Sequence, residues 1–188
     1  LDKEENIKNP RHAVVIGLQD KYHKDCAIEF AKRGYHILLE KPMAVTEEDC
    51  IEIHRHVKEA GVQLCVGHVL RYTPITQKVK KMISEGCIGR VAHIQHFEPI
   101  GWFHHAHSYV RGAWSKEKES SFLLMTKSCH DIDWLTYVTG KKCVQVSSFG
   151  GLVNFTKENK PDGAADRCLD CPAHVENKCA YSAKKIYL

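Results

Sequence analysis

Lys41 is the side chain of this sequence whose position best suits it to do chemistry. It belongs to the tripeptide Glu40-Lys41-Pro42, which directly follows the short apolar run His36 to Leu39. Open α/β sheets bind ligands at the carboxyl ends of their strands, so a charged pair after a buried strand is a candidate site. An ammonium group there can stabilise negative charge that develops on a reacting oxygen. The alternative is a solvated turn in which Lys41 has no function.

His130 is a second residue that could do chemistry. An imidazole has an ordinary pKa of about 6.5, so it can take or give a proton near neutral pH. His130 lies within a segment whose pattern predicts a helix, Phe122 to Val138, closed by Gly140. A histidine inside a helix can equally be a structural residue, and its type alone leaves both interpretations open.

The segment Gly101 to Glu119 is rich in His, Trp and Tyr and has no clear period, which predicts a long functional loop. Aromatic faces combined with hydrogen-bond donors suit a sugar ring. We therefore expect Trp102, His107 and Arg111 to bind a sugar-like substrate. The alternatives are a packed flap without ligand contacts and a metal site formed by His105 and His107.

Three of the nine cysteines lie close together as Cys168-x2-Cys171-x7-Cys179, with His174 in the last interval. Close pairs of this kind are typical of zinc or iron-sulfur ligands, and three thiols with an imidazole could form a closed tetrahedral structural zinc site. Free or redox-active thiols and a disulfide are the alternatives. The other six cysteines are scattered, which favours reduced thiols in a cytoplasmic protein.

The composition excludes several classes of partner. The chain has 188 residues, 43% of them hydrophobic, enough for one domain or two small ones. It carries 27 basic and 23 acidic residues without a block of one sign, so we expect no nucleic-acid partner. Apolar runs such as Ala13 to Ile16 are far shorter than the roughly 20 residues that cross a bilayer, and the polar segment Leu1 to Pro10 has no signal-peptide core. We expect no membrane association.

The first part of the chain alternates strand and helix patterns. Strands are expected at His12 to Leu18, His36 to Leu39 and Gln63 to Gly67, and helices at Lys24 to Arg33 and from a Thr46 cap to Gly61. Strands separated by helices of this length predict a parallel sheet with right-handed crossovers.

After Pro74 the rhythm changes. We expect a helix at Thr76 to Glu85 and strands at Arg90 to Pro99 and Lys142 to Phe149. These strands predict the start of a second, antiparallel sheet.

The motifs resemble those of the Gfo/Idh/MocA oxidoreductases, a family that includes glucose-fructose oxidoreductase and inositol dehydrogenases. The resemblance rests on order and spacing over most of the chain: Ala13 to Ile16 followed by Gln19, Asp20 and His23, then Gly34 to Pro42, Arg71, Gly86 to Arg90 and Cys129 to Asp133. It implies a partial NAD(P)-binding domain with a Rossmann-type parallel sheet at residues 1–70, and an α+β substrate and oligomerisation domain with an open, mostly antiparallel sheet at 71–188. Family members begin with a Gly-rich phosphate-binding turn, which does not occur here. We therefore expect a fragment that begins midway through the first domain and stops before the second sheet is complete.

The resemblance also implies roles for individual residues. The cofactor would be NAD or NADP, with Lys41 and His130 as catalytic residues, Lys41 between nicotinamide ribose and substrate and His130 as the base. The implied cofactor-binding residues are Gln19, Asp20, His23, Glu40, Lys41 and Pro42, and the implied substrate-binding residues outside the aromatic segment are Arg71, Tyr72 and Thr126. Asp133 could orient His130, and an ion pair is the alternative role for Arg71.

Thr126 departs from the family pattern, because the family usually has an aspartate four residues before its catalytic histidine. A hydroxyl cannot supply the charge of a carboxylate, so either Lys127 compensates or the reaction differs.

The expected function is hydride transfer between nicotinamide and a sugar, polyol or related hydroxy compound. A glycosidase that uses NAD for transient oxidation of a sugar is one alternative, and a non-catalytic binding or scaffold homologue is another. The expected partners are a small sugar-like substrate and further copies of the chain, joined through the second sheet.

Overall fold

The computed structural model describes residues 12–188 and shows two compact units. The first unit contains the described residues up to Pro99 together with the segment Lys116–Cys143, and the second contains Ile100–Ser115 and Val144–Leu188.

The first unit contains a three-stranded parallel sheet with the order β1-β2-β3. The strands are β1 (Ala13–Ile16), β2 (His36–Leu39) and β3 (Leu64–Val66). In the register, Ile16 pairs with Leu39 and Leu39 pairs with Val66. The parallel pairing expected from the alternating pattern is confirmed, and the carboxyl ends of the three strands meet at one edge.

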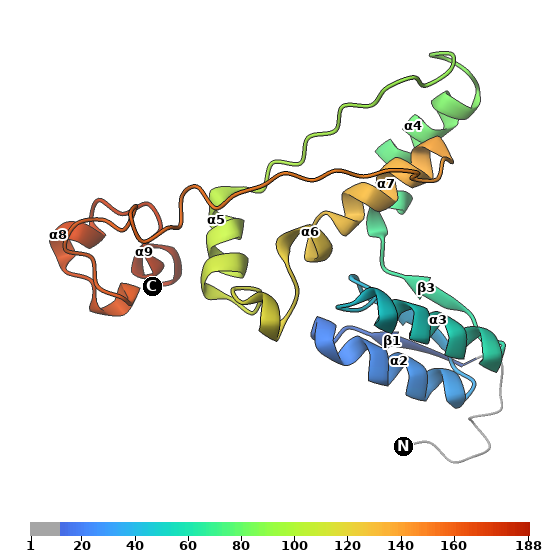
Figure 1. Ribbon diagram of the computed structural model, residues 1–188, viewed down its shortest axis with the longest axis horizontal. Coiled ribbons are helices and arrows are strands. Elements are labelled where there is room, and N and C mark those ends of the chain that lie inside the picture. The colour runs from blue at the N-terminus through green and yellow to red at the C-terminus, as the bar shows by residue number, and fades with distance from the viewer. Residues whose placement is uncertain (1–11) are drawn as a thin grey trace. The chain divides into compact units, whose positions relative to one another are not determined.

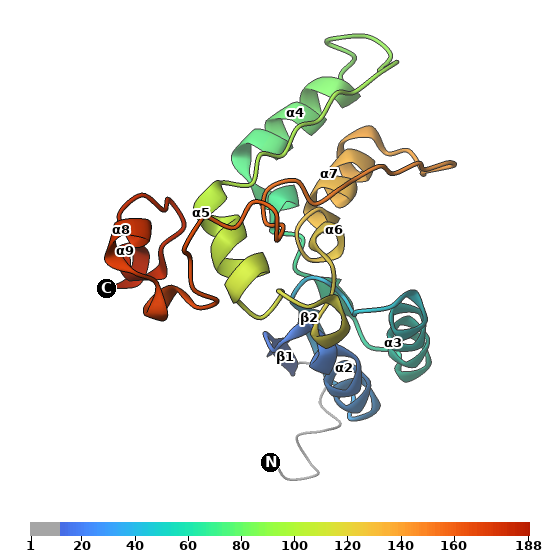
Figure 2. The same ribbon diagram turned by 60° about the vertical axis from the view of Figure 1, so that its left-hand side comes forward.

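Helices α2 (His23–Lys32) and α3 (Glu47–Ala60) pack against this sheet, as Figure 1 and Figure 2 show. The core between these helices and the sheet consists of Ile16, Ala27, Ile28, Ala31, Ile37, Leu39, Ala44, Ile53 and Val57. On the opposite face of the sheet, Val15 is 68% exposed and Leu38 is 40% exposed. The strands are therefore apolar on both faces, as is typical of parallel sheets, and α2 and α3 cover one of them.

Local signals set the ends of these helices. The Thr46 hydroxyl accepts a hydrogen bond from the Asp49 backbone N–H at 3.1 Å, which is the expected N-cap of α3. Gly61 ends α3 with a positive φ of 68°, and Gly34 follows α2 with a φ of 80°, a conformation that glycine adopts without steric cost.

The other regular elements of the first unit are helices and turns. It comprises the 3-10 turns η1 (Asp20–Tyr22), η2 (Val69–Tyr72) and η4 (Glu117–Glu119) and the helices α4 (Pro74–Ser84), α6 (Leu123–Thr126) and α7 (Cys129–Thr139). Helices α4 and α7 are in contact. The Trp134 indole N–H donates to the Thr76 hydroxyl at 2.9 Å, and the Lys80 ammonium lies 3.4 Å from the centre of the Tyr137 ring. These contacts hold α7, which carries His130, against α4.

The single helix expected over Phe122 to Val138 is divided into α6 and α7. In a continuous helix the Thr126 carbonyl would accept from the His130 backbone N–H. Here it accepts instead from the Lys41 ammonium at 2.9 Å, while the His130 N–H donates to Lys127 at 3.3 Å. The side chain of a residue distant in sequence therefore takes the carbonyl that the helix would have used.

The second unit contains short helices only, among the residues described. They are α5 (Trp102–His105), the π-helix η3 (Ala106–Arg111), the 3-10 turn η5 (Cys168–Asp170), α8 (Ala173–Glu176) and α9 (Ala183–Tyr187). The prediction of a loop throughout residues 101–119 was wrong, because residues 102–111 are helical.

Ring contacts between residues four apart explain why this helix has no hydrophobic period. The Phe103 and His107 rings stack with centres 6.2 Å apart, and the His105 and Tyr109 ring centres are 5.8 Å apart. Residues four apart are neighbours on a helix surface, so these mixed aromatic and imidazole pairs can support it without an apolar stripe.

The strands expected at residues 90–99 and 142–149 are not formed. Both segments lack regular structure (Figure 1), and the three parallel strands are the only ones within residues 12–188. A strand needs a neighbour that pairs with its N–H and C=O groups, and the described chain supplies none to these segments. Phe97 is 83% exposed and Val144 is 97% exposed as a result. The described structure therefore does not contain the expected antiparallel sheet.

Within the described part of the chain, no helix combines the length and the apolar character that a membrane span requires.

Candidate active site

The tripeptide Glu40-Lys41-Pro42 lies at the carboxyl edge of the sheet, directly after β2. The Glu40 backbone N–H donates to the Ile16 carbonyl at 2.9 Å, which joins the ends of β2 and β1. The Glu40 carboxylate lies against Gly67, which follows β3. A Cβ atom placed on Gly67 would be 3.1 Å from Glu40 Oε2, tighter than an ordinary contact. Glycine at this position therefore leaves the space that the carboxylate occupies.

His23 holds this loop in place from inside the protein. Its side chain is fully buried, with Nδ1 2.8 Å from the Pro42 carbonyl oxygen and Nε2 3.0 Å from the Leu18 carbonyl oxygen. The imidazole therefore bridges the loops that follow β1 and β2. We expected His23 to contact the cofactor, but its ring nitrogens instead face backbone carbonyls and its side chain is inaccessible to a ligand.

Removing the His23 imidazole should loosen the Lys41 loop. We expect His23→Ala to lower the free energy of unfolding by about 2 kcal/mol, because it removes a fully buried side chain and the ring N–H that either the Pro42 or the Leu18 carbonyl oxygen accepts. Urea unfolding of the chain measures this, with His54→Ala on the exposed face of α3 as the matched control. A loss no larger for His23→Ala than for His54→Ala would contradict the bridging role.

The two other residues expected at the cofactor edge after β1 have different surroundings. Gln19 is exposed, and its backbone carbonyl accepts from the Tyr22 N–H at 2.9 Å. Asp20 is 6% exposed, and its carboxylate accepts a hydrogen bond from the Ser121 hydroxyl at 2.9 Å. Gln19 is therefore open to a ligand, whereas the Asp20 carboxylate is used to anchor the segment that leads into α6.

Lys41 and His130 belong to the same unit, and Lys41 acts electrostatically on His130. Burial is the main cause that lowers the pKa of His130, and the positive charge of Lys41 lowers it further; His68 and Lys127 act in the same direction, against Asp131. The Nδ1 atom of His130 is buried without a hydrogen-bond partner among the described residues. Burial and Lys41 therefore favour the neutral form of the imidazole, whose Nδ1 atom is an unused polar atom.

His68 is a residue of this site that sequence reasoning missed. Its ring is perpendicular to that of His130 with ring centres 5.8 Å apart, and its Nδ1 is also buried without a partner in residues 12–188. Burial lowers the pKa of His68, helped by Arg71 and Lys41 and opposed by Asp133. Its position two residues after β3, at the same edge as Lys41, was a signal that could have identified it.

Arg71 and Asp133 form a two-point ion pair. Arg71 Nε donates to Asp133 Oδ2 at 2.7 Å, and Nη2 donates to Oδ1 at 2.5 Å. Arg71 was expected to contact the substrate and Asp133 to orient His130, but the two side chains bind each other. This contact is the ion pair that was the alternative role for Arg71. Tyr72 beside them is 69% exposed. The pair fixes η2, which follows His68, to the helix that carries His130.

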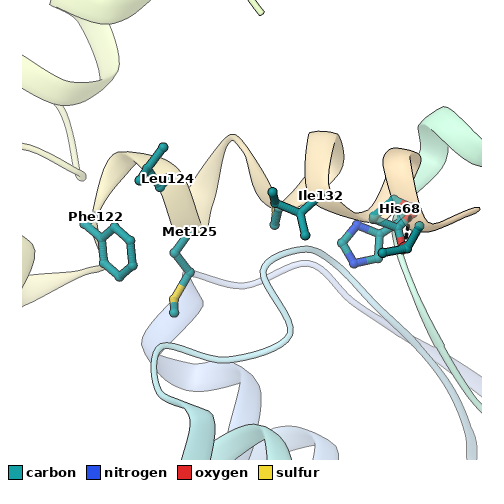
Figure 3. Close-up of a pocket in the computed structure, with 8 residues that line it drawn as sticks. His68, Phe122, Leu124, Met125 and Ile132 are labelled. Carbon is teal, nitrogen blue, oxygen red and sulfur yellow. Dashed lines mark hydrogen bonds between the residues drawn. The ribbon is translucent and has the colours of Figure 1, made fainter. Parts of the chain in front are cut away.

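A cavity of about 500 Å³ opens along α6 and α7 (Figure 3). Its walls are mostly apolar, and its polar groups include His68 and Asp133. The lining residues are His68, Phe122, Leu124, Met125, Cys129, Ile132, Asp133 and Thr136. Thr126 does not line it: this residue is 2% exposed, and its hydroxyl donates to the Phe122 carbonyl at 3.3 Å.

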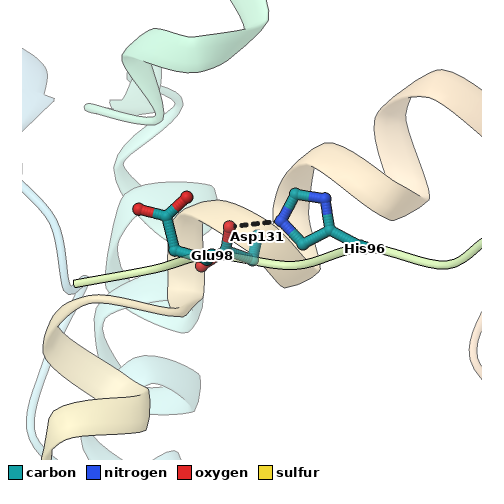
Figure 4. Close-up of side chains that lie close together, drawn as sticks. All are labelled: His96, Glu98 and Asp131. Atoms are coloured by element: carbon teal, nitrogen blue, oxygen red, sulfur yellow. Dashed lines mark hydrogen bonds and ion pairs between the residues drawn. The ribbon is translucent and has the colours of Figure 1, made fainter.

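His96, Glu98 and Asp131 form a second polar cluster, which had no signal in the sequence (Figure 4). One possible ligand atom from each residue lies within 4.8 Å of the others. This is the only group of three or more His, Cys, Asp or Glu side chains so close together in the described chain. His96 Nε2 lies 2.7 Å from Asp131 Oδ1, and the Lys127 ammonium lies 3.7 Å from Glu98. A metal ion would compete with that ammonium. The cluster therefore consists of the His96–Asp131 hydrogen bond and the Lys127–Glu98 ion pair, and its Asp131 directly follows His130 in the sequence.

The aromatic residues expected to bind substrate lie in the second unit and contact its C-terminal segment. The Trp102 and Tyr181 ring centres are 5.8 Å apart, His107 Nδ1 lies 2.5 Å from the Tyr187 hydroxyl, and Arg111 Nη1 donates to the Tyr181 carbonyl at 2.6 Å. Trp102 is still 53% exposed. These contacts correspond to the packed alternative, and a substrate role for these residues remains a prediction.

The parallel sheet with covering helices, and with Lys41 and His68 following β2 and β3, is of the Rossmann type. Residues 2–68 match the profile described as the oxidoreductase family, NAD-binding Rossmann fold, and residues 76–181 match the GFO/IDH/MocA C-terminal domain. The chain belongs to the Gfo/Idh/MocA family.

Known relatives are about 30% identical to this chain over the aligned region. It is 31% identical to the 2,7-anhydro-N-acetylneuraminate hydratase of Escherichia coli K12, over 73% of this chain and 36% of the relative. It is 30% identical to the scyllo-inositol 2-dehydrogenase (NAD(+)) of Bacillus subtilis 168, over 76% of this chain and 39% of the relative. A levoglucosan dehydrogenase solved with NADH and levoglucosan is 30% identical with a TM-score of 0.59, covering 74% of this chain and 38% of that one. The chain thus spans well under half the length of these relatives.

Proposed function

We propose that this chain carries the catalytic residues of an enzyme that transfers a hydride between NAD(P) and a hydroxyl-bearing carbon of a sugar or polyol. The observation that supports this most directly is that the Lys41 ammonium binds the carbonyl of Thr126, four residues before His130, and that its charge lowers the pKa of the half-buried His130. A base for the hydroxyl proton and a positive charge near the alkoxide are what the reaction requires of the protein.

The residues at the sheet edge also fit a nicotinamide cofactor. The unpartnered Nδ1 atoms of His68 and His130 are polar groups that a bound ligand could satisfy. Exposed Gln19 and the Glu40 carboxylate follow β1 and β2, where Rossmann-type sheets hold their cofactors. When bound, the cofactor accepts the hydride that leaves the substrate carbon.

The protein's own residues would then manage the proton and the charge. His130, neutral because of burial and of Lys41, takes the proton of the substrate hydroxyl onto its ring. The ammonium of Lys41 stabilises the oxygen as negative charge develops on it.

The names of two relatives support the substrate class, because levoglucosan and scyllo-inositol are both cyclic polyhydroxy compounds. A second candidate is a reaction without net oxidation, in which the cofactor oxidises the sugar only transiently. It is favoured by the relative named as a hydratase, since hydration changes no oxidation state, and by Thr126 in place of the aspartate.

We also propose that residues 1–70 and 71–188 belong to a cofactor domain and to a substrate and oligomerisation domain, respectively. The exposed apolar side chains at residues 90–99 and 142–149 are the kind that an open antiparallel sheet would bury, and such a sheet would join copies of the protein. Light scattering of the complete gene product tests the assembly, and a monomer at all concentrations would contradict it.

The activity test uses the complete gene product with NAD⁺ or NADP⁺ and a panel of inositols, levoglucosan and aldoses. We expect reduction of the cofactor, followed by absorbance, with at least one compound. Conversion seen by mass spectrometry without net reduction would favour the second candidate. A protein that neither binds dinucleotide nor converts any compound would overturn both catalytic candidates. The remaining alternative would then be a non-catalytic binding or scaffold role.

A further inference from the structure

The second unit lacks the apolar core that a small folded unit needs. In Ile100–Ser115 and Val144–Leu188, only two hydrophobic side chains, Ala106 and Val175, are buried. This part of the chain also contains no strand. Units of this size that cannot bury enough apolar surface are typically held together by disulfides or by a structural metal.

Three thiols gather around Val175. The turn η5 places Cys171 one turn after Cys168, with the Cys171 backbone N–H 3.3 Å from the Cys168 carbonyl. Helix α8 follows, and the Cys179 backbone N–H after it donates to the Val175 carbonyl at 3.1 Å. All three cysteines line one cavity of about 710 Å³, and all three are free and half-buried.

The polar side chains around this cavity are mostly basic. Arg111, Lys157, Lys160 and Arg167 line it together with the single carboxylate of Asp166, which pairs with Lys160 at 2.6 Å. The Nε and Nη2 atoms of Arg111 are buried without hydrogen-bond partners in the described structure. N–H donors to thiolate sulfur are the usual second layer of a metal site.

We propose that Cys168, Cys171 and Cys179 bind a structural zinc ion, with His174 as the fourth ligand. His174 precedes Val175 and lines a smaller cavity, of about 240 Å³, together with Cys179. The four side chains are not gathered within 4.8 Å of one another, so zinc binding would draw them together. Because the free unit has little core, the ion would supply a large part of its stability. A disulfide would use only two of the three thiols.

Zinc content is the direct test of this proposal. We expect about one zinc per chain in protein purified under reducing, metal-replete conditions, measured by mass spectrometry of the metals. Cys171→Ser should lose the zinc, whereas Cys87→Ser, at an exposed thiol of the first unit, should keep it. Cobalt(II) should replace zinc and give absorption bands typical of thiolate-to-metal charge transfer and of tetrahedral coordination. His174→Ala should alter the bands of tetrahedral coordination.

A second measurement uses the unmodified protein, so it does not depend on whether the variants fold. Titration of the unmodified protein with a mercurial should release zinc in step with the modification of Cys168, Cys171 and Cys179, which peptide mass spectrometry distinguishes from the other six free thiols. Three results would each overturn the proposal. The first is zinc far below one equivalent in folded protein, and the second is bound iron with a visible chromophore. The third is an intact protein mass lowered by the loss of thiol hydrogens, which shows a disulfide. None of these readouts depends on the activity proposed for the first unit.

Discussion

Replacing Lys41 by methionine in the complete gene product should lower kcat/KM by about 10³-fold, one of the two largest effects expected of a single change. Methionine keeps the approximate length and packing of the side chain but removes the charge that would stabilise the substrate oxygen. Steady-state kinetics on the best compound of the panel measures the effect. Lys58→Met, on the exposed face of α3, is the matched control and should be close to wild type. A Lys41→Met enzyme within tenfold of wild type would refute the catalytic role.

The same variant should shift the pKa of His130. The ammonium of Lys41 lowers that pKa in the folded protein, so its removal should raise the pKa. A base must be neutral to act, and activity is therefore lost as the pH falls through the pKa. The acid limb of the residual activity should move to higher pH in Lys41→Met, and NMR titration of His130 should show the same direction.

Lys41 also binds the Thr126 carbonyl at the break between α6 and α7, so its loss could move α7 as well. Lys41→Arg separates the two effects, because arginine keeps a charge and a donor. If both variants lose activity while only Lys41→Met shifts the His130 pKa, charge and exact placement are both needed. If neither variant shifts it, the proposed coupling is wrong.

The second large effect is expected at His130. His130→Gln should lower kcat by about 10³-fold with a much smaller change in KM, because the side chain acts on the proton that moves in the transition state. Glutamine retains hydrogen-bonding atoms but cannot take the proton. The control is His54→Gln, an exposed histidine of α3.

The pH profile of the unmodified enzyme provides a further check on His130. Burial and the neighbouring cations lower its pKa, so its charged form is disfavoured in the folded protein. Activity should persist below the ordinary histidine pKa of about 6.5 and fall only at lower pH. This limb should disappear in His130→Gln. A limb that persists unchanged in the variant would assign it to another group, with His68 the first candidate.

Much of the first unit could be predicted from the sequence because its signals are local. Cap residues, glycines and hydrophobic period place α2, α3 and the three strands close to where the structure has them. Lys41 was identified as a site candidate because a charged pair followed a buried strand. The same logic, applied to the end of β3, would have identified His68.

The rest could not be predicted because it depends on contacts between distant segments. The break before α7 exists because Lys41 takes the Thr126 carbonyl, and Arg71 is held by an aspartate 62 positions away. The helix at residues 102–111 is supported by rings that carry no hydrophobic period. The strands expected at residues 90–99 and 142–149 failed for a related reason, since a strand forms only where a partner is present.

The sequence by itself determined the class of this protein, the parallel order of its sheet and the catalytic candidates Lys41 and His130. Tertiary structure alone decided what surrounds them: the buried bridge from His23 to Pro42, the unpartnered ring nitrogens and the neutral state of His130. Residue types and short-range spacing specify which groups are present and how the chain turns locally. Burial and long-range contacts specify their protonation and their free hydrogen-bonding atoms, because both depend on neighbours that are close only in the folded chain.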